Sequence, residues 1–363
     1  LTALAISAIT PLTPWQSVLI MGVLCLIYCT LGGIEAVIWT DTIQTIVLLG
    51  GAVICVVYLL GGINGGLGGL LDLARANDKM TMVNLDFGPD SFTTLALWVI
   101  ILGGLGQNLS SYTSDQAVVQ RYMTTKDTAA AARSIWANGI MAALGALIFF
   151  FIGTGLYAFY HSNPVQLNST IQNDQIFPMF IAAELPVGIA GLIVAGIFAA
   201  AQSTVSTSMN STATTLVTDF LRPFNRCDSE AGYLKAAKGL TLVMGVLGTL
   251  AGLIFISPEI RSLMSEYFKV IGMFMGALGG LFLLGIITTR AHSHGAFLGL
   301  LGGVGVMIWV WRSTDINGFL YSFIGVSSCL LLGYIASVFL PAPDNDLENL
   351  TLHTMTAKEA THE

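Results

Sequence analysis

Nine apolar segments of spanning length follow one another along the chain, and they constrain its fold more than any other feature. A helix of about 20 mainly apolar residues crosses the hydrocarbon core of a membrane and satisfies its own backbone hydrogen bonds there. The expected spans are residues 15–31, 37–60, 92–112, 135–160, 189–220, 236–256, 267–289, 294–311 and 319–340. The sequence therefore predicts an all-α polytopic membrane protein.

The composition agrees with a membrane protein. Of the 363 residues, 54% are hydrophobic and only 10% are charged, whereas a soluble domain carries about 25% charged residues. The formal net charge of −7 includes no basic patch, so no nucleic-acid partner is expected. The five cysteines show neither a metal-binding spacing nor a disulfide framework.

The Lys and Arg residues indicate the orientation of the chain. If the connections alternate, nine of the 14 lie on one side, namely Arg121, Lys126, Arg133, Arg222, Arg226, Lys235, Lys238, Arg290 and Lys358. Cytoplasmic loops carry the basic excess, so this side and the C-terminus are expected in the cytoplasm. We expect one transmembrane transport domain at 1–340 and a cytoplasmic tail at 341–363. Residues 1–9 are apolar but too short to span, so further helices are expected upstream.

A run of hydroxyl side chains lies inside one of the predicted spans. Residues 199–215 read AAAQSTVSTSMNSTATT, in which nine of seventeen side chains are Ser or Thr. Neutral oxygens of this kind can bind a small hard cation, and polar clusters at membrane depth usually mark an ion or substrate path. A helix-packing face rich in Ser and Thr gives the same pattern. The residues alone leave both interpretations open.

Two more polar residues lie at membrane depth. Asp41 is near the cytoplasmic end of its span, where a carboxylate is a functional candidate unless it reaches the interface. Asn108 follows Gly103, Gly104 and Gly106, and we expect an unwound stretch there that lines a cavity. The alternative for Asn108 is an ordinary helix end.

Three blocks of sequence resemble the sodium:solute symporter family. They read GGIEAVIWTDTIQ at 32–44, DQAVVQRY at 115–122 and LPVGIAGLIVAGIFAAAQSTVSTSMNSTATTLVTDF at 185–220. Within the family the sequence is most similar to the bacterial sialic-acid branch, while the proline, sugar and vitamin branches share the general plan. The resemblance implies an inverted-repeat fold of two five-helix units, of which the N-terminal helices are missing from this chain.

The resemblance also implies two sodium sites on the hydroxyl-rich helix. The main site matches the Ala200 carbonyl and the hydroxyls of Ser203 and Thr204. The second site matches Asp41, Ser206 and Thr207. Residues 203 and 207 fall on one helical face with 206 close by, so ions could pass along the helix toward the carboxylate.

The implied solute contacts lie in the span at 92–112. Asn108 matches a solute-binding asparagine, and Ser111 or Tyr112 falls where the family places a gating aromatic. The sugar branch has a lysine at the position of Met141, which argues against a simple sugar as the solute.

The function that we expect is sodium-coupled import of sialic acid (N-acetylneuraminate) or a related sugar acid across a bacterial inner membrane. The sodium ion (Na⁺) would be the coupling ion, and the lipid bilayer, the ions and the solute are the expected partners, with no protein partner evident. A symporter for another solute, such as a sugar, proline or a vitamin, is the first alternative.

Two alternatives come from other classes. A passive channel could have a pore lined by hydroxyls, although a helix interrupted by glycines at 103–108 fits a gated binding site better. A membrane-embedded enzyme could use Asp41 with Glu35 or His292. The sequence contains no HExxH motif, no nucleophile and base at a useful spacing and no cofactor fingerprint, so we expect a protein that is not an enzyme.

Overall fold

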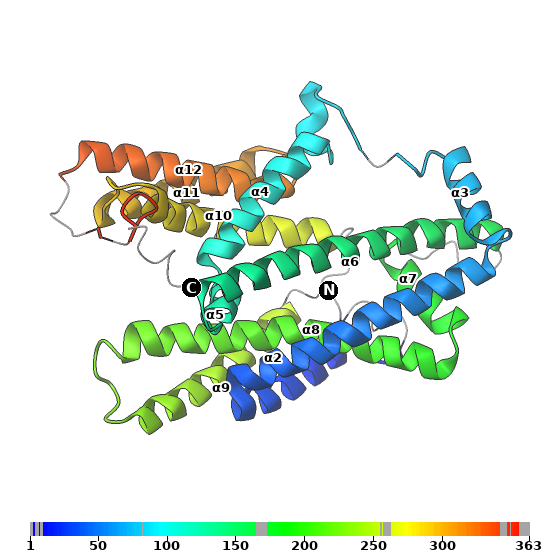
Figure 1. Ribbon diagram of the computed structural model, residues 1–363, viewed down its shortest axis with the longest axis horizontal. Coiled ribbons are helices and arrows are strands. Elements are labelled where there is room, and N and C mark those ends of the chain that lie inside the picture. Colours follow the sequence, from blue (N-terminus) through cyan, green and yellow to red (C-terminus); the bar gives the residue numbers. More distant parts are fainter. Residues whose placement is uncertain are drawn as a thin grey trace. The chain divides into compact units, whose positions relative to one another are not determined.

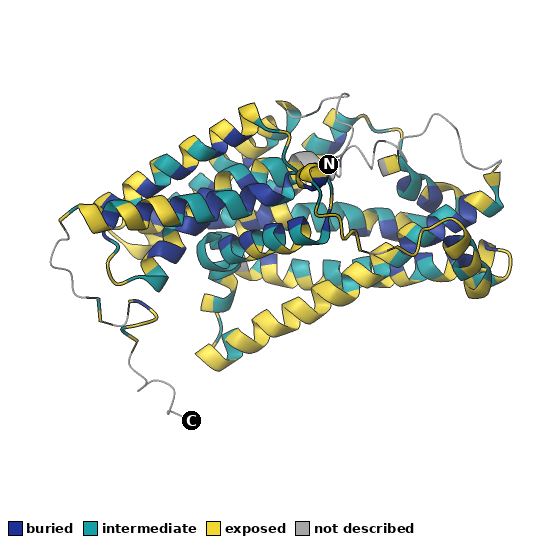
Figure 2. Cartoon of the chain, turned by 90° about the horizontal axis from the view of Figure 1, so that it is seen from above, coloured by how far each residue is buried: buried dark blue, intermediate teal, exposed yellow. Residues whose placement is uncertain are grey.

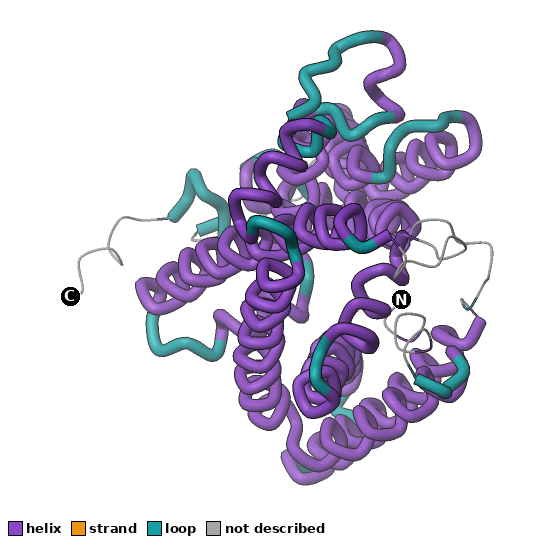
Figure 3. The backbone as a smooth tube through the Cα atoms, turned by 90° about the vertical axis from the view of Figure 1, so that its right-hand side faces the viewer, coloured by secondary structure: helices purple, strands orange, loops and turns teal. Residues whose placement is uncertain are grey.

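The computed structural model describes residues 3, 7, 10–81, 83–164, 173–254, 256, 263–341, 347–348 and 350–355. Within these ranges the chain forms helices, turns and loops, and no strand occurs (Figure 3). Two compact units make up the chain. Leu1–Thr81 and Gln120–Glu259 form the first, and Met82–Val119 and Ile260–Glu363 form the second.

The first unit contains most of the helices labelled in Figure 1. They are α2 (Pro14–Gly62), α3 (Gly66–Ala76), the second half of α5 (Gln116–Met123), α6 (Thr128–Ser162), α7 (Asn173–Glu184), α8 (Val187–Thr215), the π-helical turn η3 (Leu216–Leu221) and α9 (Glu230–Ile254). The second unit contains η1 (Pro89–Thr93), α4 (Leu97–Ser114), α10 (Leu263–Ile287), α11 (Ser293–Ser313) and α12 (Phe319–Phe339).

Eight helical segments within the described ranges are long and apolar enough to cross a membrane. They are Pro14–Gly32, Glu35–Gly62, Thr128–Ser162, Val187–Leu221, Glu230–Ile254, Tyr267–Ile287, Ser293–Ser313 and Phe319–Phe339, and they coincide with eight of the nine expected spans. The ninth, at 92–112, is observed as α4, whose second half is polar. Exposed residues occur along the helices (Figure 2). On α6 the apolar side chains of Trp136 and Phe150 are 75% and 73% exposed.

The first two spans belong to one helix, α2. The expected gap between the spans at 15–31 and 37–60 falls where Pro14–Gly32 ends and Glu35–Gly62 begins. A Cβ at Gly32 would lie 2.3 Å from Cβ of Ala36, whereas Cβ atoms four residues apart in a regular helix are about 5–6 Å apart, so regular helix geometry is interrupted at this glycine. The first span packs Gly22 against Thr249 of α9, and the second packs Gly51 against Ile193 of α8. The first span also reaches α8, because the Tyr28 hydroxyl donates to the Gln202 carbonyl.

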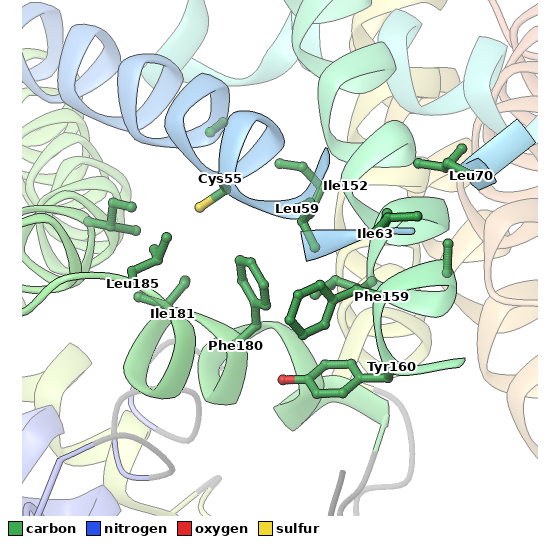
Figure 4. Close-up of a cluster of buried hydrophobic side chains, with 14 residues drawn as sticks. Cys55, Leu59, Ile63, Leu70, Ile152, Phe159, Tyr160, Phe180, Ile181 and Leu185 are labelled. Carbon is green, nitrogen blue, oxygen red and sulfur yellow. The ribbon is translucent and has the colours of Figure 1, made fainter. Parts of the chain in front are cut away.

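A hydrophobic core joins the second half of α2 to α6, α7 and α8 (Figure 4). At its centre the rings of Phe159 and Phe180 meet edge to face, with 5.2 Å between their centroids. Gly62 lets the Phe159 ring approach α2, since a Cβ at residue 62 would lie 2.3 Å from that ring. This core fixes one end of α2 against α8, and the polar residues of both helices lie further along.

The glycines of α4 serve packing within the second unit. A Cβ at Gly103 would lie 2.3 Å from the carbonyl oxygen of Phe319, and one at Gly106 would lie 2.4 Å from the backbone nitrogen of Phe323. The helix is continuous across them. The expectation of an unwound stretch before Asn108 was therefore wrong, because close contact with α12 is what requires the missing side chains.

Part of the C-terminal tail covers the end of α10. The backbone N–H of Leu352 donates to the carbonyl of Ile286 (2.9 Å), and Nε2 of His353 donates to the carbonyl of Ile287 (3.2 Å). Both acceptors lie in the last turn of α10, whose carbonyls have no partner within the helix. The rest of the tail expected at 341–363, residues 342–346, 349 and 356–363, lies outside the described residues.

Candidate cation and solute sites

Six of the nine hydroxyls in residues 199–215 donate hydrogen bonds to carbonyls of their own helix, α8. The donors are Ser203, Ser206, Ser208, Ser211, Thr212 and Thr214, at 2.8–3.2 Å from carbonyls three or four residues earlier. Such bonds are common for Ser and Thr within membrane helices. Each hydroxyl uses its one O–H donor in this bond, and its oxygen keeps two lone pairs. These bonds therefore leave the oxygens able to coordinate a cation.

The three residues expected at the main sodium site share one face of α8, because they stand at positions i, i+3 and i+4. The Ser203 hydroxyl lies 2.8 Å from the Ala200 carbonyl oxygen, so two of the expected ligand oxygens are adjacent. Thr204 is exposed, and its hydroxyl has no hydrogen-bond partner in the described part of the chain. These side chains present their oxygens at one turn of α8.

The residues expected at the second sodium site are joined by a side chain that the sequence did not single out. Nη2 of Arg121 donates to Oδ2 of Asp41 and also to Oγ1 of Thr207, the latter at 2.8 Å. Asp41 comes from α2 and Thr207 from α8, so one guanidinium nitrogen connects the two helices. Ser206, the third expected ligand, is fully buried and donates to the Ser203 carbonyl.

Arg121 is positioned by α5. The Asp115 side chain accepts the backbone N–H of Ala117 (2.9 Å) and so caps the start of this helix. One residue before Arg121, Nε2 of Gln120 reaches Oγ1 of Thr214 at 3.5 Å. Consecutive side chains of α5 thus bond to α8 and hold the guanidinium at the carboxylate.

The Asp41 carboxylate has one oxygen without a partner. Oδ2 accepts from Arg121, while Oδ1 is buried and makes no hydrogen bond within the described residues. Leaving a buried acceptor unpaired costs about 1–3 kcal/mol. A cavity of about 300 Å³ adjoins this carboxylate, lined by Ile38, Asp41, Thr42, Thr45, Arg121 and Thr124. The site therefore combines an unsatisfied carboxylate oxygen, hydroxyl oxygens and a space beside them.

Two features of the sequence could have indicated that Arg121 belongs to the site. It lies in the block at 115–122, and an ionised Asp41 at membrane depth needs a positive partner. What the sequence lacked was a reason to pair residues 80 positions apart. From the sequence alone, Arg121 counts only among the basic residues that indicate the cytoplasmic side.

The expected solute residues lie on α4, in the second unit. Asn108, Ser111 and Tyr112 share one face of the helix, again at positions i, i+3 and i+4. The Asn108 amide donates to the carbonyl of Gly104 (2.7 Å). Gln107, next to Asn108, accepts the Ser322 hydroxyl of α12 at 2.8 Å. Asn108 is exposed and Ser111 and Tyr112 are partly buried, and the three polar side chains lie together on this face of α4.

Comparison with known proteins decides the family. The family model of the sodium:solute symporter family matches residues 3–303 of the chain. The chain belongs to the sodium:solute symporter family. It is therefore a sodium-coupled membrane transporter and not an enzyme, and sodium is its transported coupling ion rather than a resident cofactor.

Several members of the family resemble this symporter over most of its length. The sodium/sialic acid symporter NanT of Aliivibrio fischeri is 32% identical over 361 residues, which cover 98% of this chain and 70% of that protein. The sodium/sialic acid symporter SiaT of Proteus mirabilis is 33% identical over 356 residues, with 96% and 70% covered. The human sodium-coupled monocarboxylate transporter 1 is 34% identical over 317 residues, with 85% and 50% covered.

A solved structure shares the fold of this symporter. It is that of a Na⁺-coupled sialic acid symporter in a substrate-bound outward-open state, and it superimposes with a TM-score of 0.83 at 32% sequence identity. The match covers 95% of this chain and 71% of the other. The all-helical membrane fold expected from the sequence is thus confirmed.

Proposed function

We propose that this symporter imports sialic acid, or a related sugar acid, together with sodium across a bacterial inner membrane. Two sodium/sialic acid symporters match nearly the whole chain at 32% and 33% identity, which supports this solute. The human monocarboxylate transporter is as similar over a shorter stretch. A smaller monocarboxylate is therefore the second candidate, and both candidates carry one carboxylate.

The single observation that carries the cation chemistry is the position of the Arg121 guanidinium. It contacts Asp41 and Thr207, two residues that the family resemblance assigns to the second sodium site. A positive charge therefore already occupies the neighbourhood in which a sodium ion would bind. Asp41 supplies the charge that stabilises either cation, because a carboxylate at membrane depth needs a positive partner.

In this arrangement the Arg121 guanidinium competes with sodium for the Asp41 carboxylate. When sodium binds to Asp41, Ser206 and Thr207, the guanidinium leaves and α5 loses one of its two side-chain bonds to α8. When sodium leaves, the guanidinium returns to the carboxylate. The exchange keeps Asp41 neutralised throughout the cycle and hinders the ion from rebinding after release.

Ala200, Ser203 and Thr204 bind the other sodium ion in this proposal. Their oxygens lie one turn along α8 from the second site, so two ions would be held in sequence on one helix. Each ion entering down the membrane potential contributes about 2.3 kcal/mol per 100 mV. Two ions roughly double this driving force for the accumulation of solute.

The solute binds at Asn108, Ser111 and Tyr112 in this proposal. The Asn108 amide offers a donor and an acceptor for hydroxyl or acetamido groups, and Tyr112 offers a ring and a hydroxyl. Solute and sodium bind reciprocally, since a sodium ion that tightens solute binding must itself be bound more tightly when solute is present. The basic loops and the C-terminal tail face the cytoplasm, as the distribution of Lys and Arg indicates.

Uptake into proteoliposomes tests this function. The purified symporter should accumulate labelled N-acetylneuraminate above the external concentration under an inward sodium gradient, and it should not do so when potassium replaces sodium. Excess unlabelled pyruvate, a small monocarboxylate, should leave uptake unchanged. Sodium-independent equilibration would indicate a channel. Accumulation of pyruvate with no accumulation of N-acetylneuraminate would favour the monocarboxylate candidate and refute the sialic-acid assignment.

A further inference from the structure

Two thiols that the transport mechanism does not use lie beside the hydroxyl-rich helix. Cys25 and Cys29 stand one turn apart on α2 and are 0% and 3% exposed. Their sulfur atoms are 3.9 Å apart, and both cysteines are free. Because a disulfide requires a separation of about 2.0 Å, the two thiols form a close pair without a covalent bond between them.

Two oxygen atoms complete the cluster. The Tyr28 hydroxyl and the carbonyl oxygen of Gln202 each lie 3.6 Å from Sγ of Cys25. The Tyr28 hydroxyl also donates to the Gln202 carbonyl, at 3.2 Å. Two sulfur and two oxygen atoms from α2 and α8 therefore lie within 3.2–3.9 Å of their neighbours.

The distance between the two sulfur atoms matches the distance between two thiolates that bind the same metal ion. Two thiolates bound tetrahedrally to Zn²⁺, at about 2.3 Å each, are about 3.8 Å apart. The helix already holds Cys25 and Cys29 at this distance. Thiolates select soft or borderline ions such as Cu⁺ and Zn²⁺ over hard ions, so the cluster differs in kind from the oxygen sites expected for sodium.

We propose that Cys25 and Cys29 form a binding site for a thiophilic d¹⁰ metal ion such as Zn²⁺ or Cd²⁺, completed by the Tyr28 hydroxyl and the Gln202 carbonyl. On binding, each thiol releases one proton to solvent and the divalent ion takes their place, so the buried complex is neutral and no oxidation state changes. The spacing C-x₃-C differs from the usual zinc spacings, which is why the sequence did not indicate a site.

The position of this site gives it a consequence for transport. Gln202 immediately precedes Ser203, one of the residues expected to bind sodium, and Ser206 neighbours both Tyr28 and Cys29. A bound ion ties α2 to α8 at this turn. It therefore stabilises the fold and inhibits movement of the hydroxyl-rich helix. The inhibition rests on the proposed function, whereas the binding and the stabilisation do not.

Cadmium binding tests the site. The parent protein is the full chain carrying Cys227→Ser, which removes the partly exposed cysteine of the α8–α9 connection. We expect it to bind one Cd²⁺ per chain by equilibrium dialysis, with a rise in Tm of several degrees that a chelator reverses. Adding Cys29→Ser should abolish both effects. Adding Cys55→Ser, another buried cysteine on α2, should leave both unchanged.

A second variant keeps the test decisive if the serine variant folds poorly. Tyr28→Phe retains the ring and removes only the oxygen donor, so it should bind Cd²⁺ more weakly than the parent. Equal binding and stabilisation in the parent, the Cys29→Ser and the Tyr28→Phe variants would overturn the site, as would a parent that binds no Cd²⁺. A Cd²⁺-loaded parent that transports at the full rate would overturn the inhibitory consequence.

Discussion

Replacing Arg121 by glutamine should make sodium bind more tightly. Glutamine keeps a hydrogen-bond donor but removes the charge that occupies Asp41 and Thr207. Sodium then no longer has to displace a guanidinium. An ordinary structural residue next to a binding site would show the opposite sign, because its loss loosens the site.

The size of the effect follows from the exposure of the pair. Hydrogen bonds to charged groups are worth about 1.5–3 kcal/mol, whereas exposed ion pairs are worth about 0.2–1 kcal/mol. The Arg121 side chain is 45% exposed and that of Asp41 is 19% exposed. We therefore expect about 1 kcal/mol, between these two ranges. This corresponds to a half-saturating sodium concentration about fivefold lower than in the parent.

The assay is solute uptake into proteoliposomes as a function of sodium concentration. Lys126→Gln is the matched control, since it removes a positive charge from the loop that follows α5 and should leave the half-saturating concentration nearly unchanged. A rise in that concentration for Arg121→Gln, or an equal fall in the control, would refute the competition between Arg121 and sodium.

Three further predictions concern single residues. Thr204→Ala should raise the half-saturating sodium concentration, and an unchanged sodium dependence of uptake would remove Thr204 from the main site. Gly106→Ala should lower the Tm, because its Cβ would lie 2.4 Å from a backbone nitrogen of α12, whereas Gly104→Ala meets no atom within 4 Å and should not; equal shifts would contradict the packing role of Gly106. Phe180→Ala should destabilise the core by about 3–5 kcal/mol, measured by denaturation in detergent, and a loss below 1 kcal/mol would show that this core is not a main source of stability.

The spans could be predicted from the sequence because the apolar character that forms them is local. Eight of the nine expected segments are observed as helices of spanning length and composition. The role of the glycines could not be predicted in the same way. Whether Gly103 and Gly106 unwind a helix or let another helix approach depends on α12, more than 200 residues away.

The candidate site could be predicted only in part for the same reason. The hydroxyls of residues 203–207 and the carboxylate of Asp41 were evident as polar groups at membrane depth. Their connection through Arg121 depends on α5 folding back onto α8, which no local pattern specifies. The thiol cluster likewise depends on α2 meeting Gln202 of α8. The sequence thus revealed the residues whose chemistry is unusual at membrane depth. It did not reveal the partners that other helices bring to them, namely Arg121 and Gln202.

The most direct test of the account is the number of sodium ions transported with each solute molecule. Parallel uptake of labelled sodium and labelled N-acetylneuraminate into proteoliposomes measures this ratio. With one ion at Ala200, Ser203 and Thr204 and another at Asp41, Ser206 and Thr207, we predict a ratio near two, falling to near one in Asp41→Ala. A ratio that is the same in the parent and in Asp41→Ala would contradict the second site.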